Sequence, residues 1–205
     1  MPSTPKIIIF DLGRVLIRIC ENWQHACAVA GVDAPTGELD STQDHALLDL
    51  VIQNEVNAID EYQFCVGIAP LLGLSVEQVA RLSDHYLLGP YPGVGDLLDD
   101  IQRAGLKTAC LSNTNSNHWR QMRDPVSPNA LPLDRLDYRF ASQLMGLRKP
   151  DDAIYAAVER TTGLAGDEIV SSMISRRTSP RPSGGDGGPS RSRLTVIRSS
   201  RRVGT

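Results

Sequence analysis

The sequence lacks the features that mark several classes of protein. No run of about 18 apolar residues occurs, so nothing predicts a membrane-spanning helix. The first apolar run is interrupted by Asp11, which argues for a strand and against a secretory signal. The four cysteines include no Cys-x-x-Cys pair, which disfavours a metal or disulfide set and favours free thiols in a reducing compartment. We therefore expect a cytoplasmic protein with no membrane partner.

Aromatic residues are also scarce, at 5% of the chain, and none follows Tyr155. The segment 171–205 is rich in Ser, Arg, Gly and Pro; it holds eight Arg, no Lys and one acid, Asp186. It therefore carries a net charge of +7. Because the whole chain has a net charge of −3, residues 1–170 carry −10. A basic tail on an acidic body is one form of nucleic-acid arm. Because this tail has no aromatic side chain to stack on bases, we disfavour nucleic acid as a partner.

The rest of the chain has the composition of a globular domain, with 41% hydrophobic and 22% charged residues among 205. The β-branched run "KIIIFDL" (6–12) predicts a buried parallel strand. After residue 89, helix and strand patterns alternate: "VGDLLDDIQRAG" and "KPDDAIYAAVERTTG" predict helices, and "LKTACLS" and "DYRFASQ" predict strands. The predicted fold is α/β, a Rossmann-like doubly wound parallel sheet.

Between these two regions, residues 20–88 have a helical pattern throughout. The stretches "NWQHACAVAGV", "DHALLDLVIQNEV", "IDEYQFCVGIAPLLG" and "SVEQVARLSDHYLLG" each predict a helix. Ser75 begins the last of them and is followed three residues later by Gln78, as in a capping box. We expect a discontinuous α/β core of residues 1–19 and 89–170, an inserted helical cap of residues 20–88, and a disordered tail of residues 171–205.

Polar residues follow the predicted strands. Asp11 ends the first strand, Ser112 and Asn113 follow "TACL", and Lys149 precedes a helix. Each alone is common in a turn or a cap. Because the carboxyl ends of parallel strands meet at one edge, we expect all four to converge there. A carboxylate, a hydroxyl with neighbouring amides and a lysine together predict a phosphate-handling site.

These residues stand in motifs that resemble those of the haloacid dehalogenase (HAD) superfamily of hydrolases. "IIIFDLGRVL" is similar to its first motif, "ACLSNTN" to its second and "LMGLRKPDDAIY" to its third, over about residues 5–170. The resemblance is nearest to the phosphatases with a helical cap that act on sugar phosphates such as glucose 1-phosphate. It implies a Mg²⁺-dependent phosphatase whose partner is a small phosphorylated metabolite.

The resemblance also implies a role for each matching residue. Asp11 would be the nucleophile that forms an aspartyl-phosphate and would bind Mg²⁺ through its other oxygen, with the backbone carbonyl of Gly13 as a second metal ligand. Ser112 and the amide of Asn113 would bind the phosphoryl group. Lys149 would stabilise the charge of the transition state.

Two positions near the first motif depart from the common pattern. Most phosphatases of the superfamily carry a second Asp, the proton-transfer group, where this chain has Gly13. The glycine is typical of a subgroup and leaves the proton-transfer group unassigned. Arg14 stands where relatives with this glycine carry a small amide, so we assign it to substrate binding and expect an altered substrate preference.

The fourth motif departs furthest. An acid pair should follow "DEIV" because the dication needs a further carboxylate, but the chain reads "SSMIS". Met173 must be encoded by ATG and Ile174 by a codon starting AT, so a frame read one base earlier forces an Asp there. We hypothesise that the chain is frameshifted from about residue 171, a point that its DNA sequence decides. Mg²⁺ binding and activity would then be weakened.

Two alternatives stay open at this stage. In a carbon–halogen hydrolase of the dehalogenase type, the same Asp11 attacks carbon and needs no metal, although such enzymes usually carry an aromatic residue at the position of Gly13. Alternatively, the chain is a catalytically inactive protein that keeps the phosphate pocket. The sequence carries no signal that sets an oligomeric state.

Overall fold

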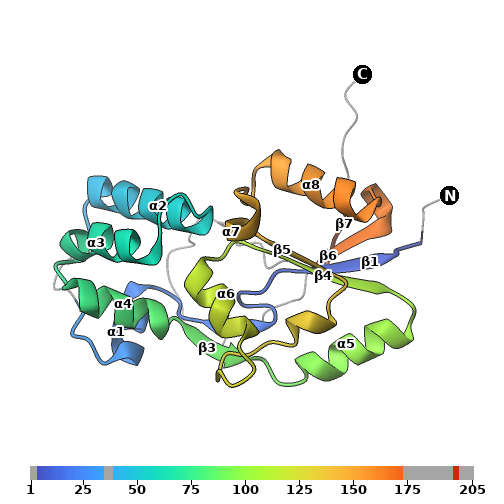
Figure 1. Cartoon of the computed structure of the whole chain (residues 1–205), viewed down its shortest axis with the longest axis horizontal. Helices are drawn as coiled ribbons and strands as arrows, with labels where there is room; N and C mark the ends of the chain where they lie inside the picture. Colours follow the sequence, from blue (N-terminus) through green and yellow to red (C-terminus); the bar gives the residue numbers. More distant parts are fainter. Residues whose placement is uncertain (1–3, 35–38, 173–195, 199–205) are drawn as a thin grey trace, which may run out of the picture.

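The chain folds around a five-stranded sheet in the order β5-β4-β1-β6-β7, seen in a computed structural model that describes residues 4–34, 39–172 and 196–198 (Figure 1). Four neighbouring strands run parallel, and the last is antiparallel to β6. The strands are β1 (Ile7–Phe10), β4 (Lys107–Ser112), β5 (Tyr138–Ala141), β6 (Ile169–Ser172) and β7 (Val196–Arg198). The central position of β1 places the residue that follows it in the middle of the sheet's carboxyl edge.

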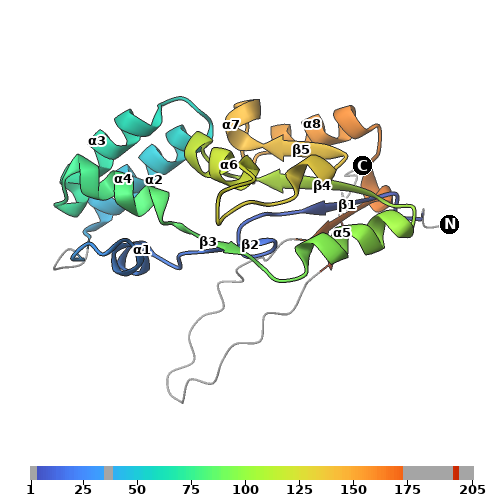
Figure 2. The same cartoon turned by 60° about the horizontal axis from the view of Figure 1, so that its bottom comes forward.

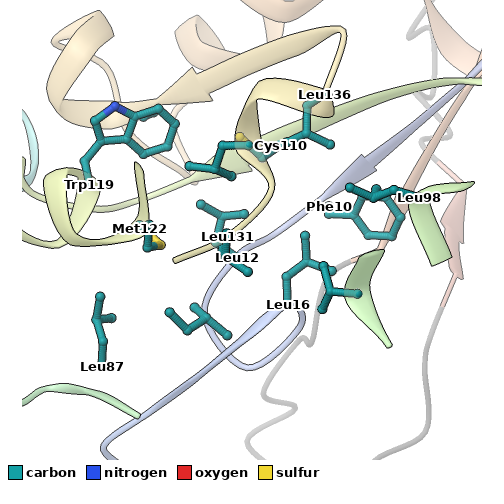
Figure 3. Close-up of a cluster of buried hydrophobic side chains, with 14 of the residues drawn as sticks. Phe10, Leu12, Leu16, Leu87, Leu98, Cys110, Trp119, Met122, Leu131 and Leu136 are labelled. Atoms are coloured by element: carbon teal, nitrogen blue, oxygen red, sulfur yellow. The ribbon is translucent and has the colours of Figure 1, made fainter. Parts of the chain in front are cut away.

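Helices cover both faces of this sheet because the side chains of each buried strand alternate between them. Phe10 packs with α5 (Val94–Arg103) and α6 (Ser116–Arg123) in one cluster, which Figure 3 shows around Leu98, Trp119 and Met122. Ile7 and Ile9 pack on the other face against α8 (Asp152–Thr162). The short helix α7 (Ser142–Met145) follows β5, and 3₁₀ turns span Leu133–Arg135 and Gly166–Glu168. The predicted α/β, doubly wound fold is confirmed.

A helical segment is inserted between two short antiparallel strands, β2 (Ile17–Ile19) and β3 (Leu87–Pro90) (Figure 2). Its helices are α1 (Trp23–Ala30), α2 (Ser41–Glu55), α3 (Glu61–Leu72) and α4 (Val76–Asp84). Capping boxes begin the last three of these helices, including the predicted pair of Ser75 and Gln78. The segment has buried clusters of its own, around Ile68 and around Leu82.

The structure corrects three boundaries. The helix predicted through "SVEQVARLSDHYLLG" ends at Asp84, because the residues from Leu87 pair with β2. Strand β6 continues through Ser172, two residues past the predicted end of the core, and pairs along its whole length with β1. The segment Val196–Arg198, predicted to be disordered, forms a strand beside β6. The rest of the predicted frameshifted, disordered tail, 173–195 and 199–205, lies outside the described residues.

Within the described ranges, no single helix is long and apolar enough to cross a membrane. Only α3 and α4 taken together reach that length and composition, and they are bent by 111° relative to each other.

Candidate functional site

Asp11 lies directly after β1, where the sheet brings β4 and β6 alongside it. Its backbone N–H donates to the carbonyl oxygen of Ser172 (3.0 Å), which continues the pairing with β6. The side chain is held at both oxygens: Oδ1 accepts from the Leu12 N–H (2.8 Å), and Oδ2 is 2.9 Å from Nζ of Lys149. Asp11 is therefore an oriented carboxylate paired with a cation.

Lys149 is positioned by β4 and by the residue after it. Its Nζ also donates to the carbonyl oxygen of Leu111 (2.8 Å), and its side chain is only 12% exposed. Its backbone is fastened by Asn113, whose Oδ1 accepts from the Lys149 N–H (2.8 Å) and whose Nδ2 donates to the Lys149 carbonyl (2.9 Å). The second and third motifs are thus joined by a two-way amide contact that aims the lysine at Asp11.

A cavity of about 390 Å³ opens at this edge of the sheet, between the core and the helical segment. Gly13, Ser112 and Asn113 of the predicted site line it. Ser112 is 2% exposed, and its Oγ donates to the carbonyl oxygen of its neighbour Asn113 over 3.4 Å. The helical segment contributes apolar side chains to the wall, including Trp23 and Phe64. The cavity is therefore polar at the strand ends, and the helical segment lines it with both apolar side chains and polar ones such as Asn54 and Ser83.

Gly13 and Arg14, which come shortly after Asp11 in the sequence, have different surroundings. A Cβ atom at Gly13 would lie 3.3 Å from Cδ1 of Ile19, a tight contact with the end of a side chain. Arg14 has a φ of 64° and sends its guanidinium to backbone carbonyls, with Nη2 3.4 Å from the oxygen of Cys20 and 3.2 Å from that of Glu21. Arg14 does not line the cavity, and neither do Asp11 and Lys149, whereas Gly13, Ser112 and Asn113 do. The guanidinium of Arg14 contacts the backbone after β2 and not the pair of Asp11 and Lys149.

An ion pair that the sequence analysis missed crosses from the helical segment to the core. Glu55, at the end of α2, lines the cavity; its Oε2 accepts from Nε and Nη2 of Arg148 at 3.1 and 2.9 Å. Burial raises the pKa of Glu55; the hydrogen bonds and charge of Arg148 and the charge of Lys149 offset part of this, while Asp11 adds to it. Because the partners are 93 positions apart in the sequence, no local pattern reveals the contact.

His118 also lines the cavity, from α6. Its Nε2 is 3.0 Å from the carbonyl oxygen of Ser83, and its ring stacks on Tyr86 at 5.6 Å. Burial lowers the pKa of His118, which favours the neutral ring. Nearby, Nδ2 of Asn117 donates to Oδ1 of Asp84 (2.9 Å). These contacts tie α4 to α6 and hold the helical segment against the core at one side of the cavity.

The described residues do not complete a magnesium site. Asp11 and the carbonyl of Gly13 are the ligands that the resemblance implies, and no group of three or more His, Cys, Asp or Glu side chains able to hold a metal occurs within 4–34 and 39–172. Beside Asp11, where the fourth motif would supply its acids, lies Ser172, whose Oγ is buried without a partner in the described structure. Mg²⁺ takes six oxygen ligands, several of them water, and proteins usually supply one or two carboxylates of that set.

Known proteins share part of this sequence and its fold. No family model matches the chain. It is 35% identical over 102 residues to the (S)-2-haloacid dehalogenase of Pseudomonas sp. (strain YL), a match that covers 48% of this chain and 42% of that protein. The fold is that of a HAD family enzyme from Bacteroides thetaiotaomicron, with a TM-score of 0.67, 24% identity and 82% and 83% of the two chains covered. The chain therefore has the fold of the haloacid dehalogenase (HAD) enzymes and is similar in sequence to one of them over half of its length.

Two further HAD structures have the same fold. A predicted HAD-like family hydrolase from Porphyromonas gingivalis superposes with a TM-score of 0.63, 21% identity and 82% of each chain covered. The L-2-haloacid dehalogenase of Xanthobacter autotrophicus, with chloropropionic acid covalently bound, superposes with a TM-score of 0.52, 20% identity, and 82% and 69% coverage. The chain spans less than half the length of the curated relative it matches. These likenesses establish a HAD-like fold and leave the activity, substrate and mechanism to be proposed.

Proposed function

We propose that this HAD protein is a phosphatase of small phosphorylated metabolites that works through an aspartyl-phosphate on Asp11. The observation that carries the proposal is the contact of Asp11 with Lys149 at the strand ends, beside Ser112 and Asn113 on the cavity wall. A carboxylate nucleophile needs a fixed orientation, and its Oδ1 and Oδ2 contacts supply one.

Each neighbouring residue has a part in this chemistry. The Ser112 hydroxyl and the Asn113 backbone N–H bind phosphoryl oxygens in the cavity. Lys149 offsets the negative charge that gathers as Asp11 approaches the phosphorus atom, because its ammonium group is buried and preoriented. Arg14, held against the carbonyls of Cys20 and Glu21, shapes the turn after the nucleophile.

Mg²⁺ is the cofactor that the resemblance implies, and a HAD family enzyme from Bacteroides thetaiotaomicron has been crystallised with magnesium and inorganic phosphate (TM-score 0.60, 22% identity, 81% and 83% coverage). When bound, the ion would offset phosphoryl charge. Asp11 and the Gly13 carbonyl would hold it in this chain. We propose that the binding is weak, because the described residues offer one carboxylate where a dication needs more.

The helical segment acts as a cap in this proposal. It closes the cavity with apolar side chains such as Trp23 and Phe64 opposite the phosphate-binding edge, so it selects the organic part of the substrate. The cavity volume of about 390 Å³ suits a small metabolite. All four cysteines are free and buried, which favours the reducing cytoplasm as the compartment.

A second candidate is hydrolysis of a carbon–halogen bond. The 35% identity to an (S)-2-haloacid dehalogenase favours it, as does the absence, among the described residues, of three grouped side chains that could hold a metal. Asp11 would then attack carbon and displace a halide, a reaction that needs no metal. Against it stands Gly13, where such enzymes usually carry an aromatic side chain.

One set of assays separates these candidates. Purified protein is given an aryl phosphate with and without Mg²⁺, and separately 2-chloropropionate, each beside Asp11→Asn. Phosphate release that Asp11→Asn abolishes supports the phosphatase, whereas halide release with the same control overturns it in favour of the dehalogenase. Binding of inorganic phosphate by folded protein without turnover of either substrate would make the chain an inactive phosphate-binding protein.

A further inference from the structure

Gly13 leaves the phosphatase site without a side chain to move protons, and the inference here rests on that proposed function. A phosphate ester needs a proton on its departing oxygen, and water needs a base when it attacks the aspartyl-phosphate. Asp11 is occupied as the nucleophile, and Lys149 is bound to it at 2.9 Å. The proton-transfer group must therefore come from elsewhere on the cavity wall.

Glu55 is placed to be that group. It lines the same cavity as Gly13, Ser112 and Asn113, so a substrate whose phosphate sits at the strand ends shares that cavity with Glu55. Glu21, the other carboxylate on this wall, is exposed on the loop after β2, whereas the Glu55 side chain is only 19% exposed. A partly buried carboxylate exchanges protons nearer neutral pH than an exposed one.

The hydrogen bonds of Glu55 leave one oxygen for chemistry. Both contacts from Arg148, at 2.9 and 3.1 Å, go to Oε2. Among the described residues no hydrogen bond is made to Oε1. The guanidinium thus fixes the orientation of the carboxyl group through two hydrogen bonds to Oε2, while Oε1 stays available to a substrate or a water molecule.

The two carboxyl groups are held by consecutive residues. Arg148 binds Glu55 and Lys149 binds Asp11, and the charges of Asp11 and Lys149 both act on the pKa of Glu55. The charged groups that face Glu55 are therefore Arg148, Lys149 and Asp11. Because burial raises the pKa of Glu55 more than Arg148 and Lys149 lower it, and Asp11 adds to the rise, the group is suited both to carry and to accept a proton.

We propose that Glu55 is the catalytic acid and base of the phosphatase. In the first step an Asp11 oxygen bonds to phosphorus, the bond from phosphorus to the ester oxygen breaks, and that oxygen takes the proton of the Glu55 carboxyl group and leaves as an alcohol. In the second step water attacks phosphorus and gives a proton to Glu55. The bond from phosphorus to Asp11 breaks, which releases hydrogen phosphate and restores both residues.

The test compares two esters in the full chain. An alkyl phosphate has a basic leaving oxygen that must be protonated, whereas a nitrophenyl phosphate leaves readily without a proton. Glu55→Gln keeps an oxygen for Arg148, and we expect it to lower turnover of the alkyl ester about 10²–10⁴-fold and that of the aryl ester far less. Glu61→Gln is the matched control, since Glu61 is a second half-buried acid of the helical segment and is not among the residues that line the cavity. It should affect both esters equally.

A second variant distinguishes a catalytic role of Glu55 from a purely structural one. Glu55→Ala leaves space for a small acid, so added formate should restore alkyl phosphate turnover in this variant and not in Asp11→Asn. Equal loss on both esters without formate rescue, or no loss in Glu55→Gln, would overturn the role of Glu55 while leaving the phosphatase standing. Wild-type protein that releases no phosphate from either ester would overturn the phosphatase and, with it, this role.

Discussion

The pairing of Asp11 with Lys149 can be measured as a coupling free energy. The two charged atoms are 2.9 Å apart, and the side chains are 27% and 12% exposed. At this separation and an effective dielectric constant of about 20, unit charges attract by roughly 5–6 kcal/mol. Desolvation offsets part of that, so we expect a net coupling of about 2–3 kcal/mol, within the range measured for close charge pairs.

A double-mutant cycle provides the measurement. The free energy of unfolding in urea is determined for wild type, Asp11→Asn, Lys149→Met and the double variant, and the deviation from additivity is the coupling. The pair of Asp100 and Arg103 on α5 serves as the control, because its atoms are equally close at 2.7 Å but its side chains are 66% and 72% exposed. We expect about 0.3–0.5 kcal/mol there. A coupling for Asp11 and Lys149 no larger than that of the control would refute the preoriented pair.

Three further outcomes follow from the packing. Gly13→Asp should lower the free energy of unfolding by about 1 kcal/mol, because the new Cβ atom would press on the side chain of Ile19. Adding Ile19→Val should restore that stability in thermal unfolding. A loss that Ile19→Val does not relieve would contradict the contact. Burial raises the pKa of the Cys65 and Cys110 thiols to about 12, so no cysteine should react with Ellman's reagent at pH 8 until the protein unfolds, and fast native labelling would count against this. A variant that ends at Ser172 lacks β7 and exposes the edge of β6, so it should aggregate more than the full chain, as measured by light scattering. Equal dispersity of the two proteins would show that β7 does not protect this edge.

The central elements of the fold can be predicted from local patterns. The run "KIIIF" is β-branched and ends at an acid, and the helix after "RKP" has apolar residues at helical spacing, so both are recognisable without tertiary information. The convergence of Asp11 and Lys149 also follows from the motifs, since Asp11 ends a strand of the parallel sheet and Lys149 lies just before helix α8, and the structure joins them at 2.9 Å.

The features that sequence reasoning missed depend on distant partners. The residues from Leu87 look like the end of a helix and become a strand only because Ile17–Ile19 lies beside them. Val196–Arg198 is a short run in a polar tail, and pairing with β6 defines it as a strand. Glu55 meets Arg148 across 93 residues, so neither position carries a local signal of its partner. In each case a long-range contact decides a conformation or a role that the local sequence leaves open.

The strand pair β2 and β3 has a consequence for how such proteins can be remodelled. The chain leaves the core through Ile17–Ile19 and returns through Leu87–Pro90, and Ile19 lies opposite Leu87 in the pairing. The two ends of the inserted segment are therefore neighbours, as the ends of a hairpin are. A short turn joining them would close the core without stretching it, and a different helical segment could be grafted at the same two points. The carboxyl edge of the sheet and the helical segment are in this sense separable parts, since the chain passes between them at two neighbouring points.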